Sequence, residues 1–231
     1  TSSGTNAPVF RLENTRFDPG ETENDPATAQ RLADGMDVYV LDAFGSAHRA
    51  HSSTEAVAHL LPAYAGLLLR AELDALGKLL GDIEHPLVLV SGGSKVADKV
   101  GEGQHLGGRA DTVIVGGKMA EELRVENPLP FDVELPIDVI AADGFAADAK
   151  TSVAPYDAVP EGWLVLDIGP ASSERFAGII RAARTVFWNG PMGVFETAAF
   201  ADGTRVVAAA LTEVPGLSVV GGGDSAAAVR T

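Results

Sequence analysis

The stretch PLVLVSGGSKVADKV, residues 86–100, decides the fold of this chain. An apolar run is followed by a glycine pair and then by a polar segment, which predicts a strand, a turn and a helix. This arrangement presents backbone N–H groups and a helix N-terminus to a phosphate. The spacing is not that of the phosphate-loop motif. Lys95 and Lys99 therefore either face a phosphate group or form a solvated pair on an exposed helix face.

The same alternation of short apolar runs and longer helical patterns continues along the chain. Strands buried on both faces read as continuous apolar runs, and their alternation with helices predicts an α/β doubly wound fold with parallel sheets. In the pattern DPATAQRLAD, Asp25 is expected to be the N-cap of a helix. The expected strands are 8–12, 37–41, 86–90, 111–115, 137–142, 162–168, 185–188 and 217–220, and the expected helices are 25–34, 63–80, 170–184 and 197–211.

Two further segments bear on the domain organisation. The helical pattern at 63–80 is long and amphipathic, with leucines largely on one side, and is expected to join two domains. The segment 126–136 contains three prolines and is expected to be irregular.

The composition excludes several classes of protein. A net charge of −15 over 231 residues argues against nucleic-acid binding, which requires a basic footprint. No apolar stretch approaches the roughly 18 residues of a membrane helix, and the first residues lack the pattern of a signal peptide. The chain has no cysteine, which excludes disulfides and fits a reducing cytoplasm.

Glycine turns follow five of the expected strands. Ligands of open parallel sheets bind outside the carboxyl ends of the strands, so five such turns predict a site there. In the last turn, Asp224 is either the N-cap of the next helix or an oxygen ligand for a nucleotide's Mg²⁺. The turns are VLVSGGSK (88–95), VIVGGK (113–118), LDIGP (166–170), FWNGPMG (187–193) and VVGGGDS (219–225).

Cationic groups follow two expected strands in the first sixty residues. Arg16 lies just past the first, and His48, Arg49 and His51 lie just past the second. In a chain this acidic, such a cluster indicates a site for an anionic small molecule. A metal site is disfavoured, because the stretch has no carboxylate or third histidine beside the two histidines.

Six motifs together resemble phosphoglycerate kinase. They occur in that family's order and span nearly the whole chain. The resemblance implies two doubly wound domains joined by a long helix. It makes 1–62 a partial N-terminal phosphoglycerate-binding domain, 63–80 the interdomain helix and 81–231 the nucleotide-binding domain. The motifs are LENTRFDPGE (12–21), DAFGSAHRAHSS (42–53), GGSKVADKV (92–100), DIGP (167–170), WNGPMGVFE (188–196) and GGGDSAAAV (221–229).

The resemblance also implies an activity: reversible phosphoryl transfer between 1,3-bisphosphoglycerate and Mg-ADP, giving 3-phosphoglycerate and ATP. Such a kinase would be a monomer in the cytoplasm. Positioning and charge neutralisation suffice for this transfer, and the residues present supply them. The non-catalytic alternative is a nucleotide-binding fragment of such a kinase. A Rossmann-type oxidoreductase is weakened by the lack of a dinucleotide fingerprint.

Site residues follow by matched position. Lys95 resembles the lysine that stabilises the transferring phosphoryl group, and Lys99 resembles one that holds nucleotide phosphates. Asp224 resembles the metal-associated carboxylate. The phosphoglycerate patch would be Arg16, His48, Arg49 and His51; the catalytic turn Gly222 and Gly223; the nucleotide side Gly116, Gly117, Asn189, Pro191, Glu196, Gly221, Gly222, Gly223, Asp224 and Ser225.

The sequence departs from the family in four places. The family's N-terminal portion, its segment after GGGDS and a helical stretch near 122–132 have no counterpart here. Lys118 stands where family members often have a small residue, near the adenine pocket, and puts nucleotide fit there in question. A parallel sheet that lacked its first strands would expose long unpaired edges, so we expect omitted segments rather than a natural truncation.

Overall fold

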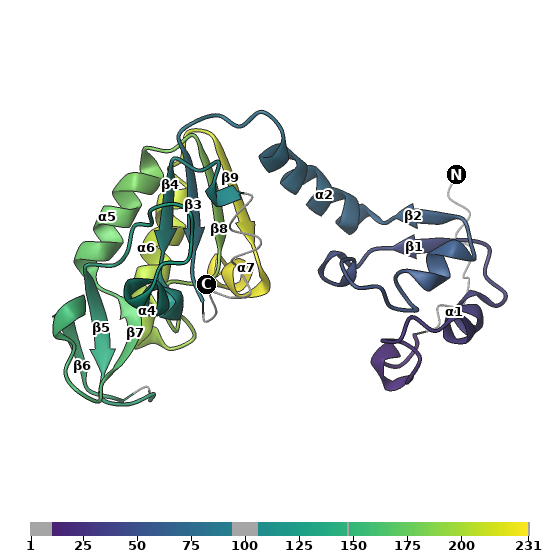
Figure 1. Cartoon of the computed structure of the whole chain (residues 1–231), viewed down its shortest axis with the longest axis horizontal. Helices are drawn as coiled ribbons and strands as arrows, with labels where there is room; N and C mark the ends of the chain where they lie inside the picture. The colour runs from purple at the N-terminus through teal and green to yellow at the C-terminus, as the bar shows by residue number, and fades with distance from the viewer. Residues whose placement is uncertain (1–10, 94–105, 147, 231) are drawn as a thin grey trace, which may run out of the picture. The chain divides into compact units, whose positions relative to one another are not determined.

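The computed structural model describes residues 11–93, 106–146 and 148–230. Lys95 and Lys99 lie outside these ranges, as does most of the strand expected at 8–12, whose described residues 11 and 12 are not in a strand. The chain divides into two compact units, Thr1–Leu80 and Gly81–Thr231 (Figure 1). Each unit is described here by itself.

The first unit begins with a capped helix and a small parallel sheet. Helix α1 covers Pro26–Ala33, and the Asp25 side chain accepts a hydrogen bond from the Thr28 N–H at 2.9 Å, which confirms the expected N-cap. Strand β1 (Tyr39–Leu41) pairs in parallel with β2 (Ala63–Ala65). Short 3-10 turns complete the unit at Thr15–Phe17, Phe44–Ser46 and Ala56–His59.

The long helix of this unit differs from the prediction. Helix α2 covers Leu67–Leu80 and not 63–80, because the first three of those residues form β2. Its start is fixed by Asp42, whose carboxylate accepts the Leu69 N–H at 2.8 Å. The leucine side of the predicted helix is largely exposed within the described residues, whereas Leu69 and Leu79 are buried.

The second unit contains a four-stranded sheet whose order is β4-β3-β8-β9, with every neighbouring pair parallel. The prediction of a parallel sheet is confirmed for these strands. Each strand lies within about two residues of its expected range. The bounds are β3 Leu87–Ser91, β4 Thr112–Val115, β8 Thr185–Asn189 and β9 Leu217–Gly221.

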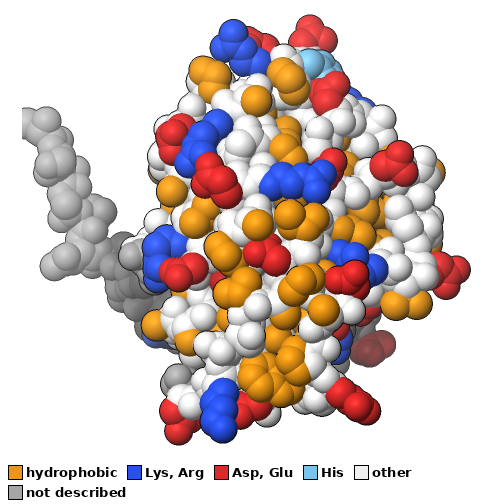
Figure 2. Space-filling view, turned by 90° about the vertical axis from the view of Figure 1, so that its left-hand side faces the viewer, with side chains coloured by type: hydrophobic (Ala, Val, Ile, Leu, Met, Phe, Trp, Pro, Cys, Tyr) orange, Lys and Arg blue, Asp and Glu red, His pale blue; other side chains and the backbone are white. Residues whose placement is uncertain are grey.

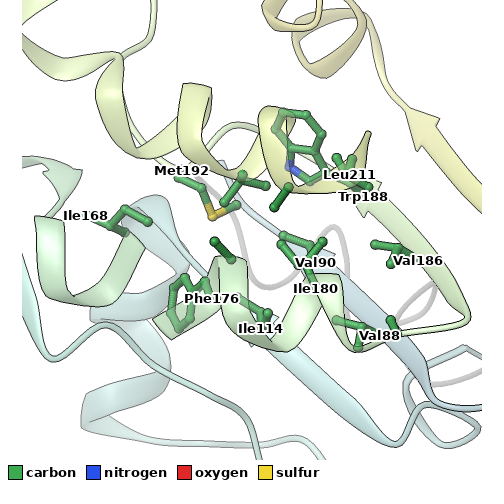
Figure 3. Packing of buried hydrophobic residues seen from close by; sticks show 14 of the residues in the cluster. Val88, Val90, Ile114, Ile168, Phe176, Ile180, Val186, Trp188, Met192 and Leu211 are labelled. Carbon is green, nitrogen blue, oxygen red and sulfur yellow. The ribbon is translucent and has the colours of Figure 1, made fainter. Parts of the chain in front are cut away.

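Helices cover both faces of this sheet, as the doubly wound prediction requires. On one face, Val88 and Val90 pack with side chains from α5 (Pro170–Arg181) and α6 (Asp202–Leu211), as Figure 3 shows. On the other face, Leu89 packs against α4 (Gly117–Val125). Because successive residues of β3 serve opposite cores, the strand has no polar side, which explains its continuous apolar run.

A second sheet contradicts part of the prediction. Strands β5 (Asp138–Ala142) and β7 (Leu164–Ile168) are antiparallel, not parallel, and β5 also pairs antiparallel with β6 (Thr151–Pro155), which the sequence did not predict. Apolar runs mark burial but carry no strand direction. The segment 126–136 is irregular, as expected, apart from one bridge between Ile114 and Glu134.

The surface mixes charges of both signs. Figure 2 shows acidic, basic and apolar side chains interspersed over the face turned to the viewer. Several are paired, for example Arg181 with Glu213 at 3.2 Å. Among the described helices, none combines the length and the apolar character that crossing a membrane requires.

Candidate functional site

The carboxyl ends of the four parallel strands form the candidate site. The chain enters the sheet at β3, continues to β4 on one side, and then adds β8 and β9 on the other side. The strand order therefore reverses between β3 and β8. Open α/β sheets bind ligands outside the carboxyl ends of the strands at such a switch point.

Hydrogen bonds tie the glycine turns at these ends to one another. The Gly92 N–H donates to Asn189 O at 3.1 Å, and the Gly117 N–H donates to Met192 O at 3.0 Å. The buried Ser225 hydroxyl accepts the Gly190 N–H at 2.6 Å. The turns after β3, β4, β8 and β9 thus form one connected backbone platform.

Several of these turns have no room for a side chain. A Cβ on Gly92 would lie 2.0 Å from the carbonyl oxygen of Pro191. Gly117 and Gly222 have φ of 62° and 86°, a backbone region that residues other than glycine rarely adopt. The glycines are therefore required by the close approach of the backbones themselves, whatever ligand the platform binds.

A cavity of about 290 Å³ opens beside this platform. Its walls come from both sheets of the second unit. The parallel-sheet turns contribute Gly93, Gly117, Pro191 and Asp224. The opposite wall is largely apolar and comes from β5, β7 and the residues around them, including Val139, Tyr156, Val165, Leu166 and Ile168. A cavity with a largely apolar wall on one side and glycine turns on the other suits a planar heterocycle joined to phosphates.

The structure excludes one of the two roles left open for Asp224, that of the N-cap. Helix α7 covers Gly223–Ala228, and its N-cap is Gly222, so Asp224 lies in the first turn and is not the N-cap. Its side chain is exposed. In the described part of the chain, no three His, Asp or Glu side chains gather to hold a metal. A single carboxylate can be one ligand of a magnesium ion that is held mainly by phosphates and water.

The other residues that the family resemblance assigns to the nucleotide do not all line this cavity. Gly116 packs against Met192, and the Asn189 side chain lies against Gly222, so both belong to the platform. Glu196 instead lines a separate hollow of about 370 Å³ with Phe195, Thr204 and Arg205. Lys118 is exposed and is one of the residues that line the main cavity.

Asp167 belongs to the site but was not singled out by the sequence. It is buried in the cavity wall, and its two oxygens accept the N–H groups of Ile168 (2.9 Å) and Gly203 (2.8 Å). A Cβ on Gly193 would lie 2.3 Å from it, so it fixes the turn after β8 and the start of α6 together. Burial raises the pKa of Asp167 to about 7, against the lowering effect of the two N–H donors. The signal in the sequence that could have identified Asp167 is an acidic residue at the end of the apolar run LVLD.

Asp167 should make stability depend on pH. Because its folded-state pKa is raised from 3.8 to about 7, the group stabilises the fold below pH 4, and this contribution is lost as pH rises through about 7, a change of roughly 4 kcal/mol. In Asp167→Asn this loss is absent. Urea unfolding from about pH 4.5 to 7.5 should show that the free energy of unfolding of the variant increases relative to that of the wild type as pH rises.

The control for this prediction is Asp157→Asn, which removes an exposed carboxylate from the same unit. Its unfolding free energy should follow the wild type at every pH. Parallel pH profiles for the wild type and Asp167→Asn would show that Asp167 is not the buried group described here.

The cationic cluster of the first unit is linked by a buried acid that the sequence did not single out. Glu21 is 2% exposed and accepts hydrogen bonds from the Ser53 N–H at 3.0 Å and the Thr15 hydroxyl at 3.3 Å. Its carboxylate also lies 3.7 Å from Nδ1 of His51. The turn that carries Arg16 and the loop that carries His51 are thus held together.

The other two members of the cluster lie on the surface of the same loop. Arg49 donates from Nε to Nε2 of His48 at 3.3 Å, and both side chains are exposed. Arg16 is exposed as well. Arg16 and Arg49 form no salt bridge with a described acid. Their exposed guanidinium groups can therefore meet an incoming anion at little desolvation cost.

The fold defines an open α/β protein with a cavity at the carboxyl edge of its parallel sheet. A sequence model of the family described as phosphoglycerate kinase matches residues 2–129 and 130–231. The chain belongs to the phosphoglycerate kinase family.

Similar proteins agree over nearly all of the chain. The phosphoglycerate kinase of Moorella thermoacetica is 49% identical over 247 residues and that of Rubrobacter xylanophilus 50% over 244, each covering 96% of this chain. The solved phosphoglycerate kinase of Pyrococcus horikoshii has a TM-score of 0.81 at 28% identity, and that of Coxiella burnetii 0.75 at 39%; both cover 94% of this chain. The structure is a partial phosphoglycerate kinase fold.

The chain spans 63% of the length of the Moorella relative and 62% of the Rubrobacter relative. The two family matches meet between residues 129 and 130. This junction falls inside the stretch near 122–132, where the sequence is expected to lack a helical segment of the family. In the structure, the stretch that follows α4 is irregular through Pro136.

Proposed function

We propose that this chain carries the nucleotide site, and part of the phosphoglycerate site, of a phosphoglycerate kinase in the cytoplasm, acting in glycolysis as a monomer. The reaction would be reversible phosphoryl transfer between the acyl phosphate of 1,3-bisphosphoglycerate and ADP, giving 3-phosphoglycerate and ATP. The observation that carries the proposal is the cavity beside the four strand-end turns, with a family membership that supplies the reaction.

The proposed roles follow from charge and position. The apolar wall would contact the base, and the glycine turns would lie against the phosphates, since glycine lets the backbone approach a ligand closely. Lys95 would neutralise charge on the transferring group, and Lys99 would hold the nucleotide phosphates. Arg16 and His51, with their loop neighbours, would bind the phosphoglycerate anion.

Magnesium would arrive with the nucleotide, and Asp224 would be its single protein carboxylate, supplying charge neutralisation at the phosphates. Asp224→Asn removes the charge but keeps the size of the side chain. We expect Mg-ADP affinity to fall about tenfold and the dependence of ADP binding on magnesium to weaken, because a carboxylate ligand is replaced by a neutral amide.

The measurement for Asp224 is calorimetric titration of ADP at several magnesium concentrations. Asp157→Asn, an exposed carboxylate outside the cavity, is the control and should bind Mg-ADP as the wild type does. Unchanged affinity and unchanged magnesium dependence in Asp224→Asn would remove the carboxylate from the metal role.

Separate titrations with Mg-ADP and with 3-phosphoglycerate test the proposed function as a whole. The kinase proposal predicts that both bind. The alternative, a non-catalytic nucleotide-binding fragment, predicts that only Mg-ADP binds. The names of the relatives favour the kinase. A chain that binds neither ligand would contradict both.

A further inference from the structure

The Tyr156 hydroxyl is a buried polar group in the wall of the candidate site. Tyr156 begins the 3-10 turn Tyr156–Ala158 after β6 and lines the cavity of the candidate site. Its hydroxyl oxygen is buried, and among the described residues it has no hydrogen-bond partner. A buried polar group left in this state costs about 1–3 kcal/mol. Such groups in native proteins call for an explanation, and a ligand is one.

The ring that carries this hydroxyl is held firmly. The Tyr156 N–H donates to Ile137 O at 3.1 Å. The Arg124 guanidinium stacks on the ring, with Cζ 3.8 Å from the centroid, and donates to the carbonyl oxygen of Pro136. Arg124 therefore fixes the ring from its face. The donor is positioned before any ligand binds.

The hydroxyl stays protonated across the working pH range. Burial, followed by the charge of Glu121, raises the pKa of Tyr156 to about 12, although Arg124 opposes this. The group can thus donate one hydrogen bond at neutral pH. What enters the cavity beside it must bring an acceptor, and the neighbouring walls of Val139, Val165 and Leu166 select a flat apolar body for it.

We propose that Tyr156 is a specificity-determining residue of the base subsite, and that its hydroxyl donates a hydrogen bond to a ring nitrogen of a purine base. The proposal rests on the proposed function, in that it takes ADP as the nucleotide. Purine rings carry unprotonated nitrogens at positions 1, 3 and 7 in adenine, any of which can accept. A base whose edge offers only a donor there would leave the hydroxyl unpaired and would bind more weakly.

Tyr156→Phe tests the proposal, because it removes the hydroxyl and keeps the ring under Arg124. We expect Mg-ADP affinity to fall about three- to tenfold, the effect of one hydrogen bond. The melting temperature without ligand should stay equal or rise, because a buried unpaired donor is removed. A purely structural tyrosine would show the reverse pattern, with lower stability and unchanged affinity.

Tyr39→Phe is the matched control. The Tyr39 hydroxyl does have a partner, since it donates to Ser53 O at 2.8 Å in the first unit. This variant should lose stability while binding Mg-ADP as the wild type does. Titration of both variants with 1-deaza-, 3-deaza- and 7-deaza-ADP then identifies the acceptor, because the effect of Tyr156→Phe should vanish for the analogue that lacks it.

The outcomes separate this proposal from the proposed function. Wild-type protein that binds Mg-ADP, together with a Tyr156→Phe variant of equal affinity, would overturn the role of Tyr156 and leave the nucleotide site standing. A Tyr156→Phe effect that persists with all three deaza analogues would also overturn it. Wild-type protein that binds no Mg-ADP would overturn both.

Discussion

Gly92→Ala should abolish measurable Mg-ADP binding, or weaken it by at least about tenfold, and should lower the free energy of unfolding by about 1–3 kcal/mol or more. The added Cβ would lie 2.0 Å from Pro191 O and 2.6 Å from Gly190 O. Both obstacles are backbone atoms, so the turns after β3 and β8 must move apart. Because these turns form the platform at the switch point, the ligand site and the fold should suffer together.

Gly178→Ala is the matched control for Gly92→Ala. Gly178 lies in α5, and apart from its chain neighbours and the nearby backbone of its own helix, no described atom lies within 4 Å of the position of its added Cβ. Alanine is the better helix former by about 0.5–1 kcal/mol, so stability should rise slightly and Mg-ADP affinity should not change. Urea unfolding and calorimetry measure both quantities. A Gly92→Ala protein that is as stable as Gly178→Ala and binds Mg-ADP as tightly would show that the turns do not meet as described.

Lys95→Ala should lower turnover by about 10²–10³-fold while changing nucleotide affinity far less. The loss of one positioned electrostatic stabiliser has this size. The reason is its place directly after the glycine turn of β3, where charge would develop on the transferring phosphoryl group. Steady-state rates in both directions, with calorimetric titration of Mg-ADP, separate the two effects.

Lys150→Ala is the control for this prediction, since Lys150 is an exposed lysine of the same unit and does not line the cavity. It should leave turnover and affinity unchanged. Near-normal turnover in Lys95→Ala would exclude Lys95 from phosphoryl transfer. A loss that appears wholly as weaker nucleotide binding would make it a binding residue instead.

The parallel sheet could be predicted from sequence because its strands are buried on both faces. Val88, Leu89 and Val90 serve two cores in turn, and this produces the continuous apolar run that marks such a strand. The Asp25 cap was also predictable, because Asp followed by proline at the first helical position is a local signal.

Other elements depend on contacts that no local pattern contains. Strands β5 and β7 are as apolar as β3, yet they pair antiparallel, because direction is set by the connections between strands. Strand β6 is largely exposed and ends in Pro155, so it lacks both the apolar run and the alternation. Residues 63–65 gave a helical pattern and were drawn into a strand by pairing with β1.

The position of the candidate site could be predicted from the sequence, but the residues that form its walls could not. Strand-end glycines locate the platform, because close backbone approach requires them at Gly92 and Gly117. The opposite wall comes from a sheet far along the chain, so Tyr156 carried no signal of its own, and Asp167 carried only that of an acid at the end of an apolar run. The separation of Glu196 into another hollow depends on the path of the turn after β8, which sequence order does not reveal.

The central claim is that the nucleotide binds at the carboxyl edge of the four-stranded parallel sheet. Titration of uniformly ¹⁵N-labelled protein with Mg-ADP, followed by amide chemical shifts, tests it most directly. We predict the largest shifts at Gly93, Gly117, Met192, Gly193 and Asp224, with little change in α1 or at the amino ends of β3 and β8. Shifts concentrated in the first unit, or at the opposite edge of the sheet, would contradict the account.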